Sequence, residues 1–284
     1  MHSATTSDTT KCEKNCDNTR QRMAQIDTEW KMISRNDKKR VMRRRGRPSL
    51  TGNKAQEHQS LNQTSQHVED SDLLRSYIET CQESLSILLE QIMALVDDDM
   101  TIQEIVCYGI GNFSRTSGHY FSASFWQLAL VLRLRSTFNV PLLYYDPCTT
   151  QFETEFLEQM GVQVISRDEK GVRTSAHTLF FMPHCPSGLY ENVLWSNWRH
   201  LKSIFIFGNS LKSYSEGLQF DGPCITAIQP WLREDVIRWS NMNASGDVEG
   251  AFNDTFLSQI KSGEKDDFPE RPYDNLREEI AIRD

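Results

Sequence analysis

The fold is decided by a pattern that first occurs as Ile105-Val106-Cys107-Tyr108-Gly109-Ile110-Gly111-Asn112-Phe113, a short apolar run followed by small and polar residues. The pattern returns as Leu142 to Tyr145 before Asp146-Pro147, Leu179 to Met182 before Pro183-His184-Cys185-Pro186, and Ile204 to Phe207 before Gly208-Asn209-Ser210. Short continuous apolar runs separated by helical patterns indicate a parallel sheet covered on both faces. Because ligands of such sheets bind at the carboxyl ends of the strands, these four loops are expected to line any site.

Composition and hydrophobicity indicate an intracellular globular protein. The 284 residues are 38% hydrophobic, which suffices for a buried core, and the apolar residues concentrate after position 71. No stretch approaches the roughly 18 apolar residues of a membrane span. The start, Met1 to Thr6, lacks the apolar block of a signal peptide. We therefore expect a soluble chain without a membrane partner.

The seven cysteines indicate buried thiols rather than disulfides or zinc ligands. Their odd number, and their positions mostly inside apolar patterns, suit a reducing compartment. Cys12 and Cys16 are separated by three residues, and no second pair follows at zinc-site spacing. A structural metal site is not expected.

The charge is divided between two parts of the chain. Residues 31–54 carry ten lysines and arginines against one aspartate, a net of +9 in a chain of formal net charge −8, which leaves −17 for the remainder. Residues 1–70 are poor in apolar residues and have no sustained period, so they cannot bury enough surface to offset the entropy of ordering. We predict a disordered basic arm over 1–70, an α/β domain over 71–262 and a flexible charged tail over 263–284.

The densest basic run of the arm resembles a nuclear-import signal. Its basic residues are Lys38, Lys39, Arg40, Arg43, Arg44, Arg45 and Arg47. Arg45-Gly46-Arg47-Pro48 also resembles the core of an AT-hook, which lays arginines in a narrow minor groove. Because there is a single copy, we favour recognition by the import machinery over specific DNA binding, and we expect the protein in both cytoplasm and nucleus.

Helical patterns alternate with the apolar runs through the domain. Ser71 or Asp72 is expected to cap one long helix that ends at Asp97-Asp98-Asp99, and Thr150 to Glu153 form a capping box for a helix that stops at Gly161. The expected strands are 104–108, 142–145, 162–165, 178–182 and 204–207, with a sixth apolar run at 224–228. The other expected helices lie at about 118–136, through 189–198, near 211–217 and at about 247–261. This alternation predicts an α/β, Rossmann-like domain in three layers with a mostly parallel sheet.

The turn after the first strand is a candidate ligand loop. Gly109-Ile110-Gly111 resembles the start of a dinucleotide or adenosylmethionine loop, in which missing side chains let backbone amides approach a ligand, and Asn112 follows it. Ser114 replaces the third glycine, and Asp146, where such folds bind a ribose, comes 35 residues after Gly111 rather than the usual ~20. We favour a tight strand-to-helix turn and an Asp-Pro turn. An adenine-containing ligand is the alternative.

His184-Cys185-Pro186 places an imidazole and a thiol at the expected crevice. A Cys-Pro pair can present a thiolate to haem iron with a nearby histidine as second ligand, so Cys185 and His184 are candidate haem ligands. The simpler interpretation is that Pro183 and Pro186 end the strand and that Cys185 is a small buried thiol. Adjacent residues of an extended chain point to opposite faces, which disfavours a catalytic Cys-His pair.

Asn209 and Ser210 close the fifth strand. Ser210 is expected to cap the short helix that follows, and Asn209 to accept the left-handed backbone of a tight turn. Ligand binding would be a second role for both residues. His119 and Tyr214 can also reach the crevice.

An ordered set of motifs makes the chain resemble one family. The set is Val106 to Phe113, Gln127-Leu128-Ala129, Tyr145-Asp146-Pro147, Met182 to Pro186, Leu189-Tyr190, Asn197-Trp198, Gly208-Asn209-Ser210 and Ala251 to Thr255. In this order the motifs are similar to the SRR-like domain, named after the plant "sensitivity to red light reduced" protein, over about residues 102–257. Residues before 70 do not contribute to this resemblance, except that they are basic in general character.

The resemblance implies a regulatory protein rather than an enzyme. Members of the family are associated with circadian-clock input in plants and with haem biosynthesis and cell proliferation in animals, in nucleus and cytoplasm, and the domain brings no settled catalytic activity. The sequence has no P-loop, no His-Glu-x-x-His and no Gly-x-Ser-x-Gly motif. We expect a regulatory chain with protein partners. The alternative is a nucleotide- or S-adenosylmethionine-dependent enzyme that uses the same loops.

Overall fold

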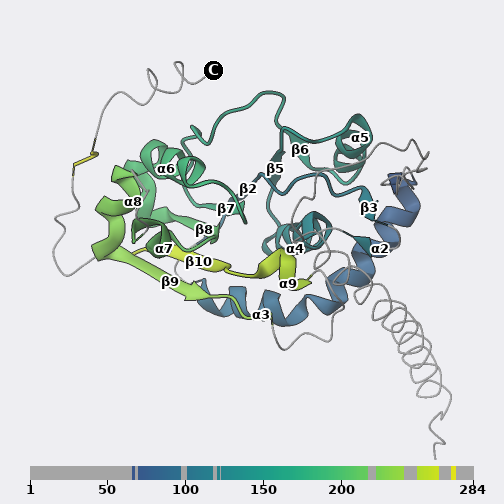
Figure 1. Ribbon diagram of the computed structural model, residues 1–284, viewed down its shortest axis with the longest axis horizontal. Helices are drawn as coiled ribbons and strands as arrows, with labels where there is room; N and C mark the ends of the chain where they lie inside the picture. The colour runs from purple at the N-terminus through teal and green to yellow at the C-terminus, as the bar shows by residue number, and fades with distance from the viewer. Residues whose placement is uncertain are drawn as a thin grey trace, which may run out of the picture. The chain divides into compact units, whose positions relative to one another are not determined.

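A seven-stranded sheet forms the middle layer of the domain (Figure 1). The structure, a computed structural model, describes residues 66–67, 70–96, 101–117, 120–121, 123–216, 222–239, 248–261 and 270–272. All of them belong to the compact unit Gln63–Asp284. The predicted import signal, and most of the predicted arm and tail, lie outside the described residues.

Most strands of the sheet are parallel. The parallel set is β2 (Glu104–Tyr108), β5 (Leu142–Tyr145), β6 (Gln163–Val164), β7 (Thr178–Met182) and β8 (Ile204–Gly208). β10 (Phe256–Ile260) is antiparallel both to β8 and to the edge strand β9 (Leu232–Val236). The order β6-β5-β2-β7-β8-β10-β9 reverses between β2 and β7, which is the switch point where such sheets bind ligands. The predicted Rossmann-like α/β class is confirmed.

Alternate residues of the central strands face two different helical layers, because successive side chains of a strand point to opposite faces. Ile105 and Cys107 of β2 belong to one core, and Val106 and Tyr108 to the other. The first face is covered by α2 (Ser71–Ser84), α3 (Ser86–Leu95), α4 (Ala123–Phe138), α5 (Gln151–Gln159) and α9 (Val248–Phe252), and the second by α6 (Ser187–Ser196), α7 (Leu211–Ser215) and α8 (Pro223–Ile228).

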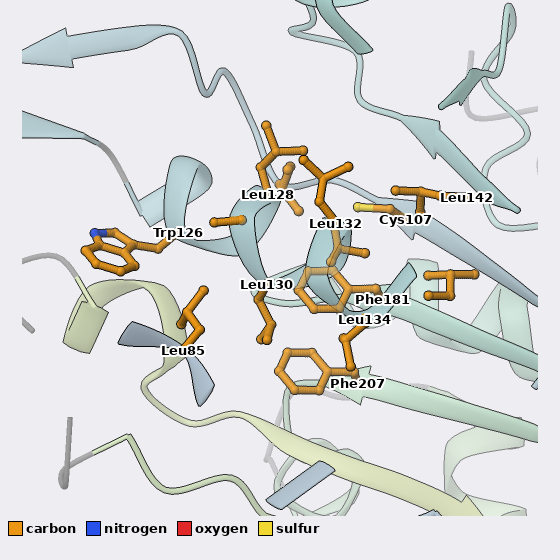
Figure 2. Packing of buried hydrophobic residues seen from close by; sticks show 14 of the residues in the cluster. Leu85, Cys107, Trp126, Leu128, Leu130, Leu132, Leu134, Leu142, Phe181 and Phe207 are labelled. Carbon is orange, nitrogen blue, oxygen red and sulfur yellow. The ribbon is translucent and has the colours of Figure 1, made fainter. Parts of the chain in front are cut away.

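The helix α4 is the central helix of the first face. Its residues Phe125 to Leu132 are all buried, because the sheet lies on one side of the helix and α2 and α9 pack on it from others. The helix is therefore wrapped in apolar residues rather than amphipathic. On the sheet below it, the rings of Phe181 and Phe207 stack with their centroids 4.7 Å apart (Figure 2).

The predicted long helix at the start of the domain is two helices. Leu85 separates α2 from α3, and it is fully buried together with Leu88 and Ile92 of the second helix. The cap is Asp70, whose carboxylate accepts the amides of Asp72 and Leu73 at 3.0 Å, rather than Ser71 or Asp72. The predicted stop at Asp97-Asp98-Asp99 lies outside the described residues.

The helix expected from 118 begins at Ala123 instead. Before it, β3 (Arg115–Ser117) and β4 (Tyr120–Phe121) form an antiparallel pair, and β1 (Gln66–His67) joins β3. Threonine, tyrosine and phenylalanine at these positions favour strands, which shortens the helix. β1 lies within the stretch predicted to be a disordered arm.

Two expectations near the end of the domain are wrong. The run 224–228 is the helix α8, whose first free amides, those of Cys224 and Ile225, donate to the Glu191 carboxylate at 2.6 and 2.9 Å. The helix expected at 247–261 is α9 followed by β10. Phe252, Phe256 and Ile260 have helical spacing, but residues 256–260 pair with strands on both sides, and this pairing decides their structure.

The edge strand β9 was not predicted. Its sequence, Leu-Arg-Glu-Asp-Val, is too charged to be recognised as a strand, although charged residues are typical of sheet edges. Arg233 and Asp235 form an ion pair of 2.6 Å along it. Within the described parts of the chain, no helix is both long and apolar enough to cross a bilayer.

Candidate functional site

Four loops meet at the carboxyl ends of the parallel strands and form what we call the carboxyl-edge site. They follow β2 (residues 109–114), β5 (146–150), β7 (183–186) and β8 (209–210), and α7 begins directly after the last of them. Hydrogen bonds join the first loop to the second and the third to the fourth, and Cys185 joins the two pairs. The structure therefore brings together Gly111, Asp146, His184 and Asn209, as the strand pattern predicts.

Asp146 connects the β2 and β5 loops. Its carboxylate accepts the Gly111 amide and the Cys148 amide, each at 2.7 Å, and the residue is only 8% exposed. Gly111 has a φ of +80°, and a Cβ there would lie 3.0 Å from the Ser124 hydroxyl, so a larger residue would be strained. The amide that a ligand would use in a glycine-rich loop is bound to Asp146. This geometry agrees with the favoured turn interpretation, and ribose binding by Asp146 stays a prediction.

Glu153 is a site residue whose wider role was missed. The predicted capping box with Thr150 is confirmed. The fully buried carboxylate also accepts the Ser114 amide at 2.7 Å and the Asn112 side-chain amide at 3.0 Å. Glu153 thus fixes the end of the β2 loop and orients the candidate residue Asn112. Nothing in the spacing of these residues, 39 positions from Ser114 to Glu153, indicates the contact.

Cys185 closes the switch point between β2 and β7. It is 3% exposed, and its thiol contacts the Tyr108 carbonyl at 3.4 Å. Gly109, with a φ of +68°, leaves the space for this sulfur, because a Cβ at that position would lie 2.7 Å from Sγ. Burial, and then the negative charge of Asp146, raise the pKa of the Cys185 thiol to about 12. Cys185 is therefore a neutral thiol near pH 7.

His184 and Asn209 join the β7 and β8 loops. The backbone of His184, with a φ of +57°, adopts the left-handed conformation that was predicted for Asn209. The His184 amide donates to the Asn209 side-chain carbonyl at 2.7 Å, which stabilises this conformation, and the Asn209 amide group donates to the Tyr214 hydroxyl at 2.7 Å. Tyr214 donates in turn to the Cys185 carbonyl at 2.9 Å. The candidate residues 184, 185 and 209 form one network with Tyr214.

The His184 ring is exposed and also contacts α9. Its Nε2 lies 3.1 Å from the Ala251 carbonyl, which accepts the Gln127 side chain at 2.9 Å as well. Ala251 is near the carboxyl end of α9, where carbonyls lack partners within the helix. In the neutral ring that donates from Nε2, Nδ1 is an acceptor. His119, another candidate, lies outside the described residues.

Ser210 stabilises the start of α7 and connects it to the strand β9. Its hydroxyl accepts the Ser213 amide at 2.9 Å, which confirms the predicted cap of α7. The same hydroxyl donates to Glu234 at 2.9 Å, and Glu234 also accepts the Leu211 amide at 2.5 Å. Glu234 was missed because it belongs to the unpredicted strand β9.

Haem fits these residues poorly. Ligation by Cys185 needs a thiolate and an open approach, whereas this thiol is buried, protonated and packed on Gly109. Across the described residues, no three His, Cys, Asp or Glu side chains are close enough to hold a metal ion.

A groove of about 540 Å³ lies away from this site. It is lined by Arg135, Ser136, Asn139, Val140, Pro141, Gly161 and Gln163. Pro141 immediately precedes β5, so the groove is at the opposite, amino-terminal edge of the sheet. It contains none of the predicted site residues.

Fold and site together define a Rossmann-like α/β protein with interlocked loops at its switch point. Residues 88–259 match the family model of the SRR1 domain, which is more than half of the chain. The chain belongs to the SRR1 domain family. The resemblance noted in the sequence is therefore confirmed.

Similar proteins occur in plants and animals. The chain is 32% identical over 185 residues to Protein SENSITIVITY TO RED LIGHT REDUCED 1 of Arabidopsis thaliana, covering 62% of this chain and 65% of that protein. It is 30% identical over 223 residues to the SRR1-like protein of Mus musculus, covering 66% of this chain and 87% of that protein. The match thus spans 65% of the plant relative's length.

The similarity to the following solved structure is low. A crystal structure of a mutant of MtNAS is 12% identical and covers 68% of this chain and 76% of its own, with a TM-score of 0.33.

Proposed function

We propose that the protein is a regulator that binds a small ligand at the carboxyl-edge site and acts, through protein partners, on biological rhythms and on haem biosynthesis. The observation that supports it is the connection of all four loops into one network at the switch point, with the His184 ring exposed. A ligand bound there contacts loops from several strands at once. The name of the plant relative, which refers to red-light sensitivity, supports the link to rhythms.

The haem connection is proposed as regulation of a pathway, separately from haem ligation. The buried, neutral Cys185 thiol is a poor ligand for iron, so the regulated process and the bound ligand need not be the same. We also propose that the protein acts in both cytoplasm and nucleus, with entry through the basic run of residues 38–47.

An enzyme that uses a nucleotide or S-adenosylmethionine is the second candidate. It is favoured by Gly109, Gly111 and Asp146 at the ends of neighbouring strands beside the switch point. It is disfavoured by the bond between the Gly111 amide and Asp146, which occupies the donor that would bind the cofactor. Incubation with S-adenosylmethionine or ATP, together with a small-molecule cell extract that supplies acceptors for the transferred group, distinguishes the enzyme from the regulator. An enzyme converts many equivalents of the donor, whereas a regulator leaves the donor unchanged.

Two histidines provide a matched test of the site. His184 and His177 are both exposed and both left-handed, with φ of +57° and +56°, but His177 precedes β7 at the opposite edge. Replacement by glycine removes the imidazole and relieves the backbone strain in both cases. In cells that lack the protein, H177G should restore haem content and rhythm period, whereas H184G at equal abundance should not. Full restoration by H184G would contradict the proposed function.

A further inference from the structure

The edge strand β9 presents half of its backbone hydrogen-bonding groups away from the sheet. It is the last strand of the sheet order, and among the described residues it pairs with β10 alone. The Ile237 amide donates to the Thr255 carbonyl at 2.9 Å, and the Lys261 amide donates to the Trp231 carbonyl at 3.0 Å. Because bonded and non-bonded pairs alternate along an antiparallel ladder, the odd-numbered residues of β9 bond to β10. The even-numbered residues therefore direct their N–H and C=O groups to the open edge.

The residues that supply the open edge are Leu232, Glu234 and Val236. The Leu232 amide donates to the Gln229 carbonyl at the end of the 3-10 helix η2 (Gln229–Trp231). Within the described part of the chain, this leaves the Leu232 carbonyl and both backbone groups of Glu234 and Val236 for a further strand. Val236 is also 46% exposed, the highest value among the large apolar side chains of the described residues. Such an edge is a template for pairing with another chain.

The charges along β9 are self-complementary in one antiparallel register. When the β9 strands of two copies pair with Glu234 opposite Glu234, Arg233 of each copy lies opposite Asp235 of the other. In the same register Leu232 lies opposite Val236. The Arg233–Asp235 positions are then a non-hydrogen-bonded pair, with Cα atoms about 4.5 Å apart, at which opposite charges attract. The next registers place Arg233 opposite Arg233 or Asp235 opposite Asp235, so the order of the charges selects a single register and a second copy as the partner.

The like-charged contact of this register, Glu234 with Glu234, is relieved by the fold. The Glu234 carboxylate accepts the Ser210 hydroxyl at 2.9 Å and the Leu211 amide at 2.5 Å at the start of α7. It also accepts the Ser258 hydroxyl of β10 at 3.1 Å. All of these donors come from the inner side of β9, because β10 and β8 precede it in the sheet order. The carboxylate is therefore held away from the open edge.

We propose that two copies of this chain associate through β9, in the antiparallel register centred on Glu234, so that their sheets become continuous. Each Glu234 amide donates to the Glu234 carbonyl of the other copy, and each Val236 amide to the Leu232 carbonyl of the other copy. Arg233 and Asp235, 2.6 Å apart within one strand, alternate in sign around the two-fold axis with those of the second copy. Since β9 has 5 residues, the contact is small and the dimer dissociates on dilution.

Sedimentation equilibrium of the full chain between about 1 μM and about 500 μM tests the proposal. The mass of the wild type should rise from that of one chain toward that of two. R233D and D235R each replace attraction across the axis by repulsion, and each should weaken association at least about tenfold. An equimolar mixture of these two variants should associate again, because each supplies the charge that the other lacks. The control R133D makes the same charge change on an exposed residue of α4 and should alter association less than about twofold.

A variant of the backbone provides a test that is independent of charge. V236P removes the amide that faces the open edge and no bond to β10, so it should also weaken association at least about tenfold. A melting curve checks the folding of each variant. The proposal would be overturned by a wild type that stays a single chain at the highest concentration, by association that R233D leaves unchanged, or by a mixture of R233D and D235R as dissociated as its components.

Discussion

At the scale of single residues, Gly109 and Cys185 determine the packing of the switch point. A left-handed glycine lets the sulfur approach the backbone, and the sulfur in turn is sealed from water. The sequence indicates both residues as candidates, but their contact depends on the register of β2 and β7, which no local pattern contains. The exposure of Cys148 in the neighbouring loop gives a direct comparison.

Alkylation at about pH 8 should separate these two thiols. Cys148 is exposed and should react with iodoacetamide quickly, whereas Cys185, with its pKa raised to about 12, should react at least about a hundredfold more slowly. Peptide mass mapping measures both rates, and in denaturant they should become similar. Fast modification of native Cys185 would mean that the thiol is accessible and would restore it as a haem-ligand candidate.

The raised pKa of the Cys185 thiol makes the stability of the protein depend on pH at high pH. Because the folded pKa of about 12 exceeds the reference value of 9.0, the protonated thiol contributes stability that is complete below pH 9 and is lost as the pH rises toward 12. The difference in unfolding free energy between wild type and C185A should therefore shrink over this range in urea titrations. A difference independent of pH would contradict the burial of Cys185.

Gly109 should tolerate no side chain. G109A should lower the free energy of unfolding by about 2 to 4 kcal/mol, because alanine is strained at positive φ and its Cβ collides with Sγ. G188A is the control: no atom lies within 4 Å of its added Cβ in α6, and stability should stay unchanged or rise by up to about 1 kcal/mol. The double variant G109A/C185A should recover part of the loss. Urea denaturation of all three variants gives the values, and equal stability of G109A and wild type would be the contrary result.

At the scale of elements, the parallel strands were predictable and their antiparallel neighbours were not. Continuous apolar runs such as Ile204 to Phe207 are buried on both faces, and they indicate a strand without knowledge of the neighbours. β10 has the spacing of a helix and β9 the composition of a loop, so β10 depends on pairing with β8 and β9, and β9 depends on pairing with β10. The helix α8 depends likewise on Glu191, a residue more than 30 positions away. Contacts distant in sequence decided each of these elements.

Glu153 connects the helix α5 to the loop after β2, and a single substitution tests this connection. E153Q keeps the shape of the side chain but turns an NH₂ group toward amide donors, so the unfolding free energy should fall by about 2 to 3 kcal/mol. E155Q, on the exposed side of the same helix α5, should change it by less than about 0.5 kcal/mol. Thermal or urea unfolding distinguishes the two. Equal effects would show that Glu153 does not hold the β2 loop.

At the scale of the whole molecule, the charge of residues 31–54 and the packed domain are predicted to act independently. Replacement of Arg43, Arg44, Arg45 and Arg47 by alanine should leave the melting temperature of the domain unchanged and move the protein out of the nucleus. Microscopy of a tagged chain and a melting curve measure the two effects. A large loss of stability would mean that the arm contributes to the fold, and an unchanged distribution would remove the import proposal.

The central claim is that the carboxyl-edge loops bind a small ligand, and intact-mass spectrometry under non-denaturing conditions tests it most directly. The protein is purified gently from cells as wild type, H184G and H177G. The account predicts a non-covalent adduct on the wild type and on H177G that is at least about tenfold depleted on H184G, since only His184 belongs to the site. The absence of any adduct, or an adduct of equal occupancy on all three proteins, would contradict it.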